Sequence, residues 1–227
     1  MHGQEILDTL QALKSRSAVA LLIRHAERYP ITDPTRSNSI EITPAGSKMA
    51  ALFGSRLAGF SRIRIFHSPL KRCRQTAESI AQGAAATGAV VEYVGVQTVL
   101  GIGYILDPAE TARLAGLHGD HFVRLWFTGK IAANIIEPAP LIARAYLDYL
   151  SAKLPEAAGG DRLDIHLSHD WNIMVLRELL LGVRHEDAGW LAYLDGVAFE
   201  PRPGALRAVY RDRSVTHAPP WRLDPAP

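Results

Sequence analysis

Segments rich in strand-forming residues alternate along the chain with segments whose apolar residues return every three or four positions. The strand-like segments are residues 20–24, 62–66, 90–94 and 163–168, and the helix-like ones are 6–13, 44–57, 141–154 and 170–181. Strands that alternate with helices build a largely parallel sheet. The pattern therefore predicts an α/β fold: a three-layer α/β/α sandwich around a mostly parallel central sheet.

The end of the chain and one internal stretch depart from this alternation. Residues 191–195, 197–200 and 206–210 are predicted to be closing strands. From 101 to about 140 the pattern loosens around glycines and prolines, so we expect a lid insertion over one end of the sheet. The proline-rich end is expected to be loosely held from about residue 214. The prediction is a single domain, 1–227, with a lid and a tail.

Polar side chains follow three of the predicted strands directly. The first strand leads into Arg24, His25 and Arg28, and Pro30 then stops any regular continuation. The second leads into Ser68-Pro69, an expected N-cap and first helical residue. Arg72 then falls in the first helical turn with Lys71, where the helix dipole disfavours cations, an arrangement expected mainly where an anion binds.

The third joint is His169-Asp170, between a strand and a helix. His166 is expected to face the interior, because strand alternation separates it from this pair. Ligands of open α/β sheets bind beyond the carboxyl ends of the strands, so the three joints are predicted to share one pocket. The residues offered to that pocket are Arg24, His25, Arg28, Arg72, His169 and Asp170.

These residue types together are those of phosphoryl transfer. Arginines bind phosphate in a bidentate manner and stay charged, a histidine can attack phosphorus, and a carboxylic acid can protonate a leaving oxygen. The chain has neither a Walker-type glycine-rich loop nor a carboxylate cluster for magnesium. We therefore expect no metal and no cofactor, with arginines neutralising the phosphate.

Composition narrows the possible partners and compartment. The chain has 227 residues, 48% of them hydrophobic, and a net charge of +2, which suits a small phosphorylated substrate better than a nucleic acid. One cysteine, Cys73, excludes an internal disulfide, so a cytoplasmic location is expected. No apolar run reaches the ~20 residues of a membrane span, and the first fifteen residues do not resemble a secretory signal. No oligomeric state follows from these features.

The three joints resemble motifs of the histidine phosphatase superfamily, which includes histidine acid phosphatases and cofactor-dependent phosphoglycerate mutases. Arg-His-Ala-Glu-Arg-Tyr-Pro at 24–30 is similar to the acid-phosphatase pattern Arg-His-Gly-x-Arg-x-Pro, with alanine replacing glycine. Residues 68–77 resemble the mutase-like branch, and His169-Asp170 resembles the acid-phosphatase His-Asp pair. The resemblance covers roughly residues 18–85 and 160–182 and implies a phosphoglycerate mutase-like fold.

The resemblance implies that His25 is the nucleophile of a metal-independent phosphatase and forms a phosphohistidine. Arg24, Arg28, Arg72 and His169 would hold the phosphate. The mutase-like branch carries a glutamate proton donor after the third strand, but residues 99–103 contain none. This assigns the donor role to Asp170, with Asp107 as the alternative. A neutral His25 and a protonated Asp170 predict a bell-shaped pH profile with its optimum on the acid side of neutral.

Several alternatives stay open at this stage. A mutase-like phosphotransferase or a non-catalytic phosphoester-binding protein would share the same motifs. Asp170 has a second interpretation as a simple helix N-cap. The histidines and aspartate at 118–121 lack a recognised metal-ligand spacing and are expected to form a solvated loop. Lid aromatics are expected either to line the substrate pocket or to belong to the core; they are Tyr104, Trp126 and Phe127.

Overall fold

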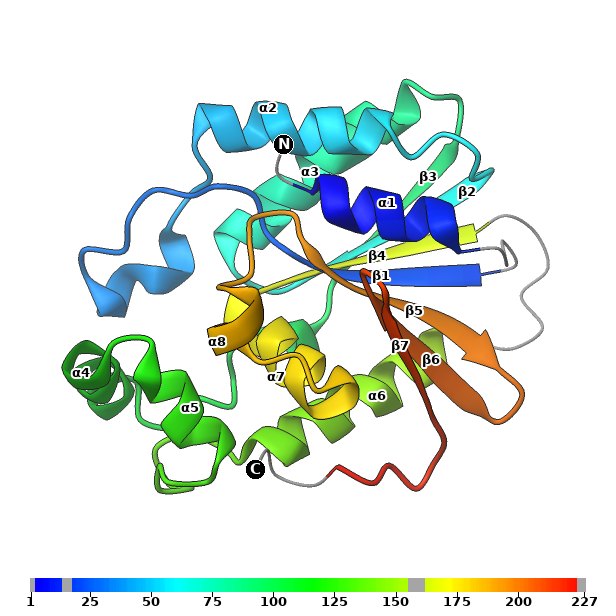
Figure 1. Cartoon of the computed structure of the whole chain (residues 1–227). Coiled ribbons are helices and arrows are strands. Elements are labelled where there is room, and N and C mark those ends of the chain that lie inside the picture. Colours follow the sequence, from blue (N-terminus) through cyan, green and yellow to red (C-terminus); the bar gives the residue numbers. More distant parts are fainter. Residues whose placement is uncertain (1–2, 14–17, 155–161, 224–227) are drawn as a thin grey trace.

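The computed structural model describes residues 3–13, 18–154 and 162–223. They contain one seven-stranded sheet in the order β3-β2-β4-β1-β5-β6-β7 (Figure 1). The strands are β1 (Ala18–Arg24), β2 (Arg62–His67), β3 (Val90–Val96), β4 (Arg162–Ser168), β5 (Gly196–Arg202), β6 (Ala205–Tyr210) and β7 (Arg213–His217). β3, β2, β4 and β1 are mutually parallel, whereas β5, β6 and β7 extend the sheet antiparallel.

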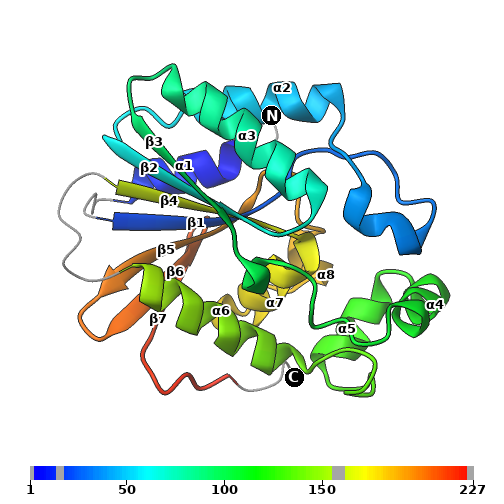
Figure 2. The same cartoon turned by 180° about the vertical axis from the view of Figure 1, so that it is seen from behind.

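Helices cover both faces of this sheet, which confirms the three-layer α/β/α prediction with a parallel core (Figures 1 and 2). On one face lie α1 (Gln4–Ala12), α2 (Pro44–Ser55) and α3 (Lys71–Ala85). On the other lie α6 (Ala139–Lys153) and α7 (Asp170–Leu181), followed by the short α8 (His185–Ala188). The turns η1 (Pro34–Ser39) and η2 (Thr98–Leu100) follow β1 and β3.

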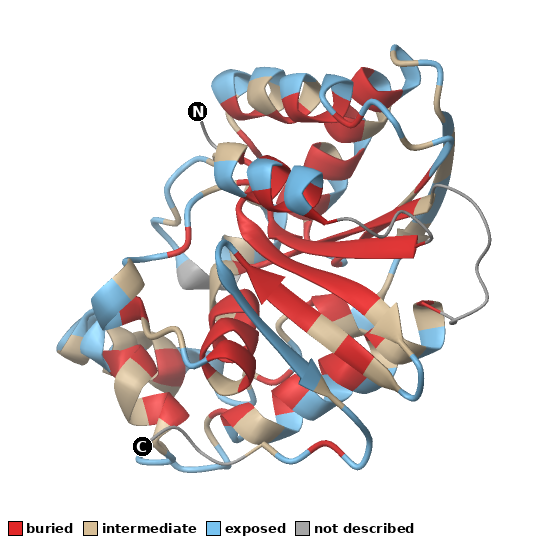
Figure 3. Cartoon of the chain, turned by 45° about the vertical axis from the view of Figure 1, so that its right-hand side comes forward, coloured by how far each residue is buried: buried red, intermediate tan, exposed pale blue. Residues whose placement is uncertain are grey.

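β1 is the centre of the core because it is buried at every position. Its side chains alternate between two apolar clusters: Leu21 and Ile23 pack toward α1–α3, and Ala20 and Leu22 toward α6 and α7. Figure 3 shows the same contrast, with β1 and α7 almost wholly buried and β7 exposed. A strand buried on both faces reads as a continuous apolar run, which explains the signal at 20–23.

Three local predictions differ from the structure. Residues 191–195 form an irregular loop rather than a strand. Residues 214–217, expected to begin a loose tail, belong to β7, and Trp221 docks by donating its indole N–H to Asp148 Oδ1 at 2.6 Å. α3 begins at Lys71 with Leu70 as N-cap, two residues later than expected; the Ser68 hydroxyl accepts from Leu70 N at 3.3 Å and also contacts His169 Nε2 at 2.9 Å. Residues 224–227 of the tail lie outside the described residues.

The segment expected to be a lid forms a small helical subdomain between β3 and α6. It contains α4 (Pro108–His118) and α5 (His121–Phe127), and α4 approaches η1 at the carboxyl end of the sheet (Figure 1). Trp126 and Phe127 are about 1% exposed and Tyr104 is 7% exposed, so these aromatics belong to the core and do not line an open pocket. His121 and Asp120 are exposed as expected, but the predicted loop is only a two-residue turn, because His118 ends α4 and His121 begins α5.

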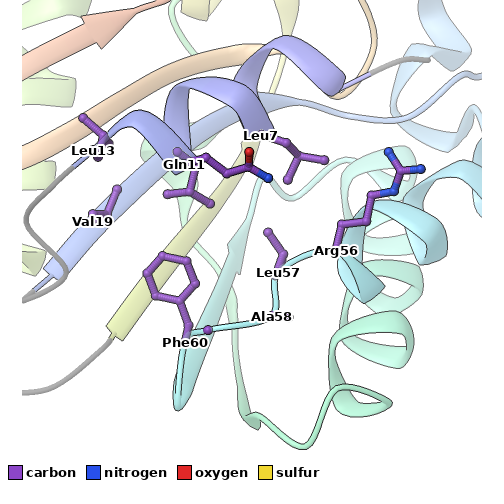
Figure 4. A pocket seen from close by; sticks show the side chains of 10 residues that line it. Leu7, Gln11, Leu13, Val19, Arg56, Leu57, Ala58 and Phe60 are labelled. Atoms are coloured by element: carbon purple, nitrogen blue, oxygen red, sulfur yellow. The ribbon is translucent and has the colours of Figure 1, made fainter.

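The opposite end of the sheet carries a small cavity of about 60 Å³ between α1 and the loop that precedes β2 (Figure 4). Leu7, Leu13, Leu57 and Phe60 line it, together with the Arg56 side chain. None of the six candidate phosphate-site residues is among its lining residues. Across the described residues, no helix is both long and apolar enough to span a lipid bilayer.

Candidate active site

Strand order and register bring the three joints together. β4 lies between β1 and β2, and its register pairs Arg24 with Ser168 and His67 with Leu167. The backbone continues this pairing beyond the strands, since His25 N donates to Ser168 O at 3.1 Å and Ser68 N donates to Leu167 O at 3.0 Å. The three parallel carboxyl ends therefore meet at one edge of the sheet, as α/β folds require of a ligand site.

His25 presents an unprotonated ring nitrogen to this site. Its Nδ1 lies 2.8 Å from the carbonyl oxygen of Ala26, which can only accept, so Nδ1 carries the proton. Nε2 keeps its lone pair and accepts from Arg72 Nε at 3.1 Å. Burial, reinforced by the charges of Arg72 and Arg24, lowers the pKa of His25 to about 3. The imidazole is therefore neutral, with Nε2 in the form needed for a nucleophile.

His169 adopts the opposite tautomer. Its Nδ1 accepts from Arg72 Nη2 at 3.2 Å, so Nε2 carries the proton and donates to Ser68 Oγ at 2.9 Å. Burial and the charges of Arg72 and Arg24 hold the pKa of His169 well below its usual range. The two imidazole rings of His25 and His169 lie 5.5 Å apart, centroid to centroid, at an angle of 64°.

Arg72 is the residue that joins the two histidines. Its Nε reaches His25 and its Nη2 reaches His169, while Nη1 donates to the carbonyl oxygen of Ser37 at 2.6 Å. The side chain is 5% exposed and stands in the first turn of α3, as predicted from the sequence. Two of its three nitrogens thus face imidazole nitrogens that only accept, a contact an incoming oxyanion could replace.

Arg24 and Asp170 form an ion pair at one side of the site. Arg24 Nη2 lies 2.8 Å from Asp170 Oδ2, with side chains 10% and 22% exposed. Burial raises the pKa of Asp170, but Arg24, the Trp190 indole N–H and His25 together outweigh it and leave the pKa below its usual value. Asp170 is the first residue of α7 and His169 is its N-cap, so the carboxylate is not a simple helix cap.

A buried hydrogen-bond network supports the joint between β4 and α7. Ser168 Oγ lies 2.8 Å from the Tyr146 hydroxyl and donates to the carbonyl oxygen of Leu100 at 2.9 Å. The Asn172 amide donates to the Tyr146 hydroxyl at 2.6 Å and accepts from the Tyr104 hydroxyl. Because these polar groups satisfy one another, the backbone carrying His169 and Asp170 has a single well-defined position.

The remaining candidates lie farther out. Arg28 is half-buried and donates to the Tyr29 carbonyl oxygen at 2.9 Å. Its charge nevertheless contributes to lowering the pKa of both Arg72 and His169. Asp107, the alternative proton donor, is exposed and caps α4 by accepting from Glu110 N at 3.0 Å. The loop of residues 29–41 that follows Arg28 borders a pocket of about 260 Å³ lined by both polar and apolar side chains.

The structure adds a segment that sequence reasoning missed, the loop of residues 189–195. The carbonyl oxygen of Leu191 accepts from Arg24 Nη1 at 2.5 Å, and the Tyr193 ring lies 4.2 Å from the Arg24 guanidinium carbon. Trp190 Nε1 donates to Asp170 Oδ2 at 3.0 Å. The strand-like composition of 191–195 hid this role. Ser68 was visible in its motif but was assigned only to capping.

One cluster among the described residues has the side chains of a metal site: Glu178, His185 and Glu186. Arg124 of α5 already pairs with both carboxylates, reaching Glu186 Oε2 at 2.7 Å and Glu178 Oε2 at 3.0 Å. The negative charge of the two carboxylates is therefore partly balanced by an internal cation. The cluster ties α5 to α7 and α8, apart from the six candidate phosphate-site residues.

Comparison with known proteins supports the motif analysis. The family model of the histidine phosphatase superfamily (branch 1) matches residues 20–92, about a third of the chain. These residues carry the Arg24–Pro30 and Ser68–Ala77 motifs, so the resemblance to the histidine phosphatase superfamily is confirmed. No curated protein matches the chain in sequence.

Solved structures share the whole fold. Bacillus stearothermophilus YhfR superposes with a TM-score of 0.60 at 16% identity, covering 85% of this chain and 96% of its own. A mycobacterial glucosyl-3-phosphoglycerate phosphatase gives 0.54 at 18%, covering 92% and 97%. A phosphoglycerate mutase from Bacillus anthracis str. Sterne gives 0.53 at 14%, covering 92% and 93%. The fold is thus phosphoglycerate mutase-like, and phosphatase or mutase chemistry is consistent with it.

Proposed function

We propose that the chain is a metal-independent phosphatase that hydrolyses a small phosphate monoester through a phosphohistidine on His25. The observation that carries this proposal is the Nε2 lone pair of His25, buried and flanked by Arg72 and Arg24. A neutral imidazole among fixed cations suits attack on a phosphate dianion, because the cations attract the dianion and the lone pair is free to react.

In the first step, a phosphate oxygen takes the place of His25 Nε2 and His169 Nδ1 as acceptor for the Arg72 nitrogens. Nε2 attacks phosphorus, the bond from phosphorus to the ester oxygen breaks, and that oxygen leaves with a proton from Asp170. Arg24, Arg28 and Arg72 balance the charge of the equatorial oxygens. The dianion also favours a protonated His169, which could then donate to phosphate from Nδ1.

Asp170 is ionised in the free site because Arg24 pairs with it. A bound phosphate draws Arg24 toward itself and adds negative charge beside the carboxylate, and both changes raise the pKa of Asp170. Substrate binding therefore favours protonation of the Asp170 carboxylate, so that it can act as the acid. In the second step the Asp170 carboxylate accepts a proton from water, which attacks phosphorus and breaks the bond to His25 Nε2.

The likeness to a phosphatase and a mutase leaves the phosphoryl acceptor as the point to establish. Water is favoured here because the described site is lined by the three joints and loop 189–195, whereas a mutase needs groups that retain a second phosphate. A chain with one cysteine forms no internal disulfide, which suits a protein that acts on a substrate in the cytoplasm.

The test is hydrolysis of p-nitrophenyl phosphate, 3-phosphoglycerate and glucosyl-3-phosphoglycerate with and without EDTA, combined with trapping of phosphohistidine under alkaline quench. We expect turnover that EDTA does not change and a labelled protein that loses its label in acid. His25→Ala should lower phosphate release by at least ~10⁴-fold. His121→Ala removes an exposed histidine and serves as the matched control.

Three outcomes would decide against the proposal. Loss of turnover with EDTA would indicate a metal-dependent reaction. Transfer of label to a phosphoglycerate acceptor, in place of release of inorganic phosphate, would establish the mutase. Tight binding of phosphate esters by the wild-type protein without turnover would establish a non-catalytic binding protein.

A further inference from the structure

Trp190 stands at the Asp170 carboxylate without belonging to the apolar core. Its indole Nε1 donates to Asp170 Oδ2 at 3.0 Å, and the side chain is 37% exposed. The residue belongs to neither apolar cluster, and the hydrogen bond to Asp170 is its direct contact with the candidate phosphate-site residues. The other face of the ring meets the His185 imidazole at 5.9 Å between centroids.

The loop that carries Trp190 is held in a strained conformation. Leu194 has φ of 61°, in the left-handed region that a leucine rarely adopts, although its side chain is fully buried. Such strain costs about 1 kcal/mol or more and persists where surrounding contacts require it. Here those contacts are with Arg24, whose backbone N–H donates to Asp195 O at 2.9 Å and whose carbonyl accepts from Leu194 N at 3.1 Å.

Each oxygen of the Asp170 carboxylate has a defined donor. Oδ1 accepts from Trp171 N at 3.1 Å, and Oδ2 accepts from Trp190 Nε1 and pairs with Arg24 Nη2 at 2.8 Å. The other charged or titratable groups that act on Asp170 are His25 after β1, Arg72 and Cys73 of α3 and Tyr104 of the insertion. In the described part of the chain, two side chains contact Oδ2, those of Arg24 and Trp190. An arriving phosphate attracts the Arg24 guanidinium away from Oδ2 but leaves the Trp190 N–H in place.

We propose that Trp190 is a positioning residue that keeps Asp170 aimed at the leaving oxygen while Arg24 binds phosphate. The inference rests on the proposed phosphatase reaction and goes beyond it. As Arg24 turns toward phosphate, the Trp190 N–H remains on Oδ2 and preserves the carboxyl orientation set by the strained loop. Without that N–H, the carboxyl is held only through Oδ1 by Trp171 N, turns more readily, and delivers its proton less often.

The experiment uses Trp190→Phe, which removes the N–H and keeps an aromatic ring. An alkyl phosphate needs a proton on its leaving oxygen, whereas p-nitrophenolate leaves with little help. We expect kcat/KM to fall about tenfold for the alkyl ester and less than about twofold for p-nitrophenyl phosphate. Because the N–H lowers the pKa of Asp170, the basic limb of the alkyl-ester pH profile should also move to higher pH.

Two further variants control the result. Trp221→Phe removes a comparable indole bond, to Asp148 Oδ1 at 2.6 Å far along the chain, and should change neither substrate by more than about twofold. Trp190→His restores a ring N–H and should recover part of the alkyl-ester rate. Equal losses on both substrates, or none, in a folded Trp190→Phe protein would overturn the inference. A wild-type protein inactive on both substrates would instead overturn the proposed function.

Discussion

The two ends of β4 each carry an aspartate paired with an arginine, and they differ in what surrounds the pair. At the amino end, Asp164 is fully buried and accepts from Arg64 Nε at 2.8 Å, with Arg162 3.3 Å away. At the carboxyl end, Asp170 keeps 22% of its side chain exposed and shares Arg24 with the site. In the first pair the carboxylate is fully buried beneath two arginines, whereas in the second the carboxylate is partly exposed and can be reached by a ligand.

A histidine near each pair shows the same difference. His166 is fully buried, stacks on Phe66 at 4.6 Å between centroids, and meets the Tyr149 hydroxyl at 2.9 Å. His169, three residues later, contacts a guanidinium and a serine hydroxyl at the sheet edge. Burial lowers the pKa of both imidazoles. A buried histidine with a depressed pKa is therefore no sign of catalysis by itself; position at the carboxyl end of the strand makes the difference.

The largest effect is expected at the carboxyl end. Arg72→Ala removes the donor that links His25 and His169, and kcat/KM should fall by ~10² to 10³ because a preorganised donor to the phosphate is lost. Arg74→Ala, two residues along α3, removes a cation that is 53% exposed and pairs only loosely with Glu78, and should leave activity within about twofold. Steady-state phosphate release measures both, and equal losses would contradict the role given to Arg72.

The amino end should respond in stability instead of rate. Asp164→Ala leaves Arg64 and Arg162 without their buried partner, and the free energy of unfolding should fall by about 3 kcal/mol, since the arginines are partly exposed. Glu92→Ala breaks the exposed pair with Arg62, which joins the neighbouring strands β2 and β3, and should cost less than about 1 kcal/mol. Urea unfolding at neutral pH gives both values. A fall in the kcat of Asp164→Ala that exceeds what its fraction of unfolded protein explains would contradict the comparison.

The smallest effect concerns His166 and pH. Its pKa is lowered from 6.5 to about 3 by burial and by the charges of Arg64 and Lys153. Between these values the unfolded chain binds a proton that the native protein does not, so stability is lost as pH falls below about 6.5. At pH 5 this group alone removes roughly 2 kcal/mol relative to pH 7.5.

His166→Gln should therefore lose about 2 kcal/mol less stability than the wild type between pH 7.5 and pH 5, while remaining acid-sensitive through His25 and His169. Denaturant unfolding at the two pH values measures the difference. His121→Gln, at an exposed position, should behave as the wild type does. If His166→Gln lost as much stability as the wild type between pH 7.5 and pH 5, this imidazole would have to be solvated in the native protein.

Local pattern predicted most of the elements because each depends on near neighbours. The helix predicted over 44–57 forms as α2 and begins at Pro44, with the N-cap Thr43 accepting from Gly46 N through Oγ1 at 2.9 Å. β1 and α7 follow from apolar periodicity. The strand predicted at residues 191–195 is wrong because strand-like composition does not reveal that the backbone hydrogen bonds of this segment go to Arg24. β7 failed because proline and polar residues nearby suggested a loose end, whereas pairing with β6 orders it.

By itself the sequence determined which residue types follow each strand, and hence that cations, imidazoles and a carboxylate would stand at three carboxyl ends. Tertiary structure alone decided that β4 separates β1 from β2, that Arg72 bridges the two imidazoles, and that loop 189–195 holds Arg24 and Asp170. The reason is physical. Composition and periodicity act within a few residues, but strand order and most side-chain partners in the site are set by contacts between segments about 20 to 100 residues apart.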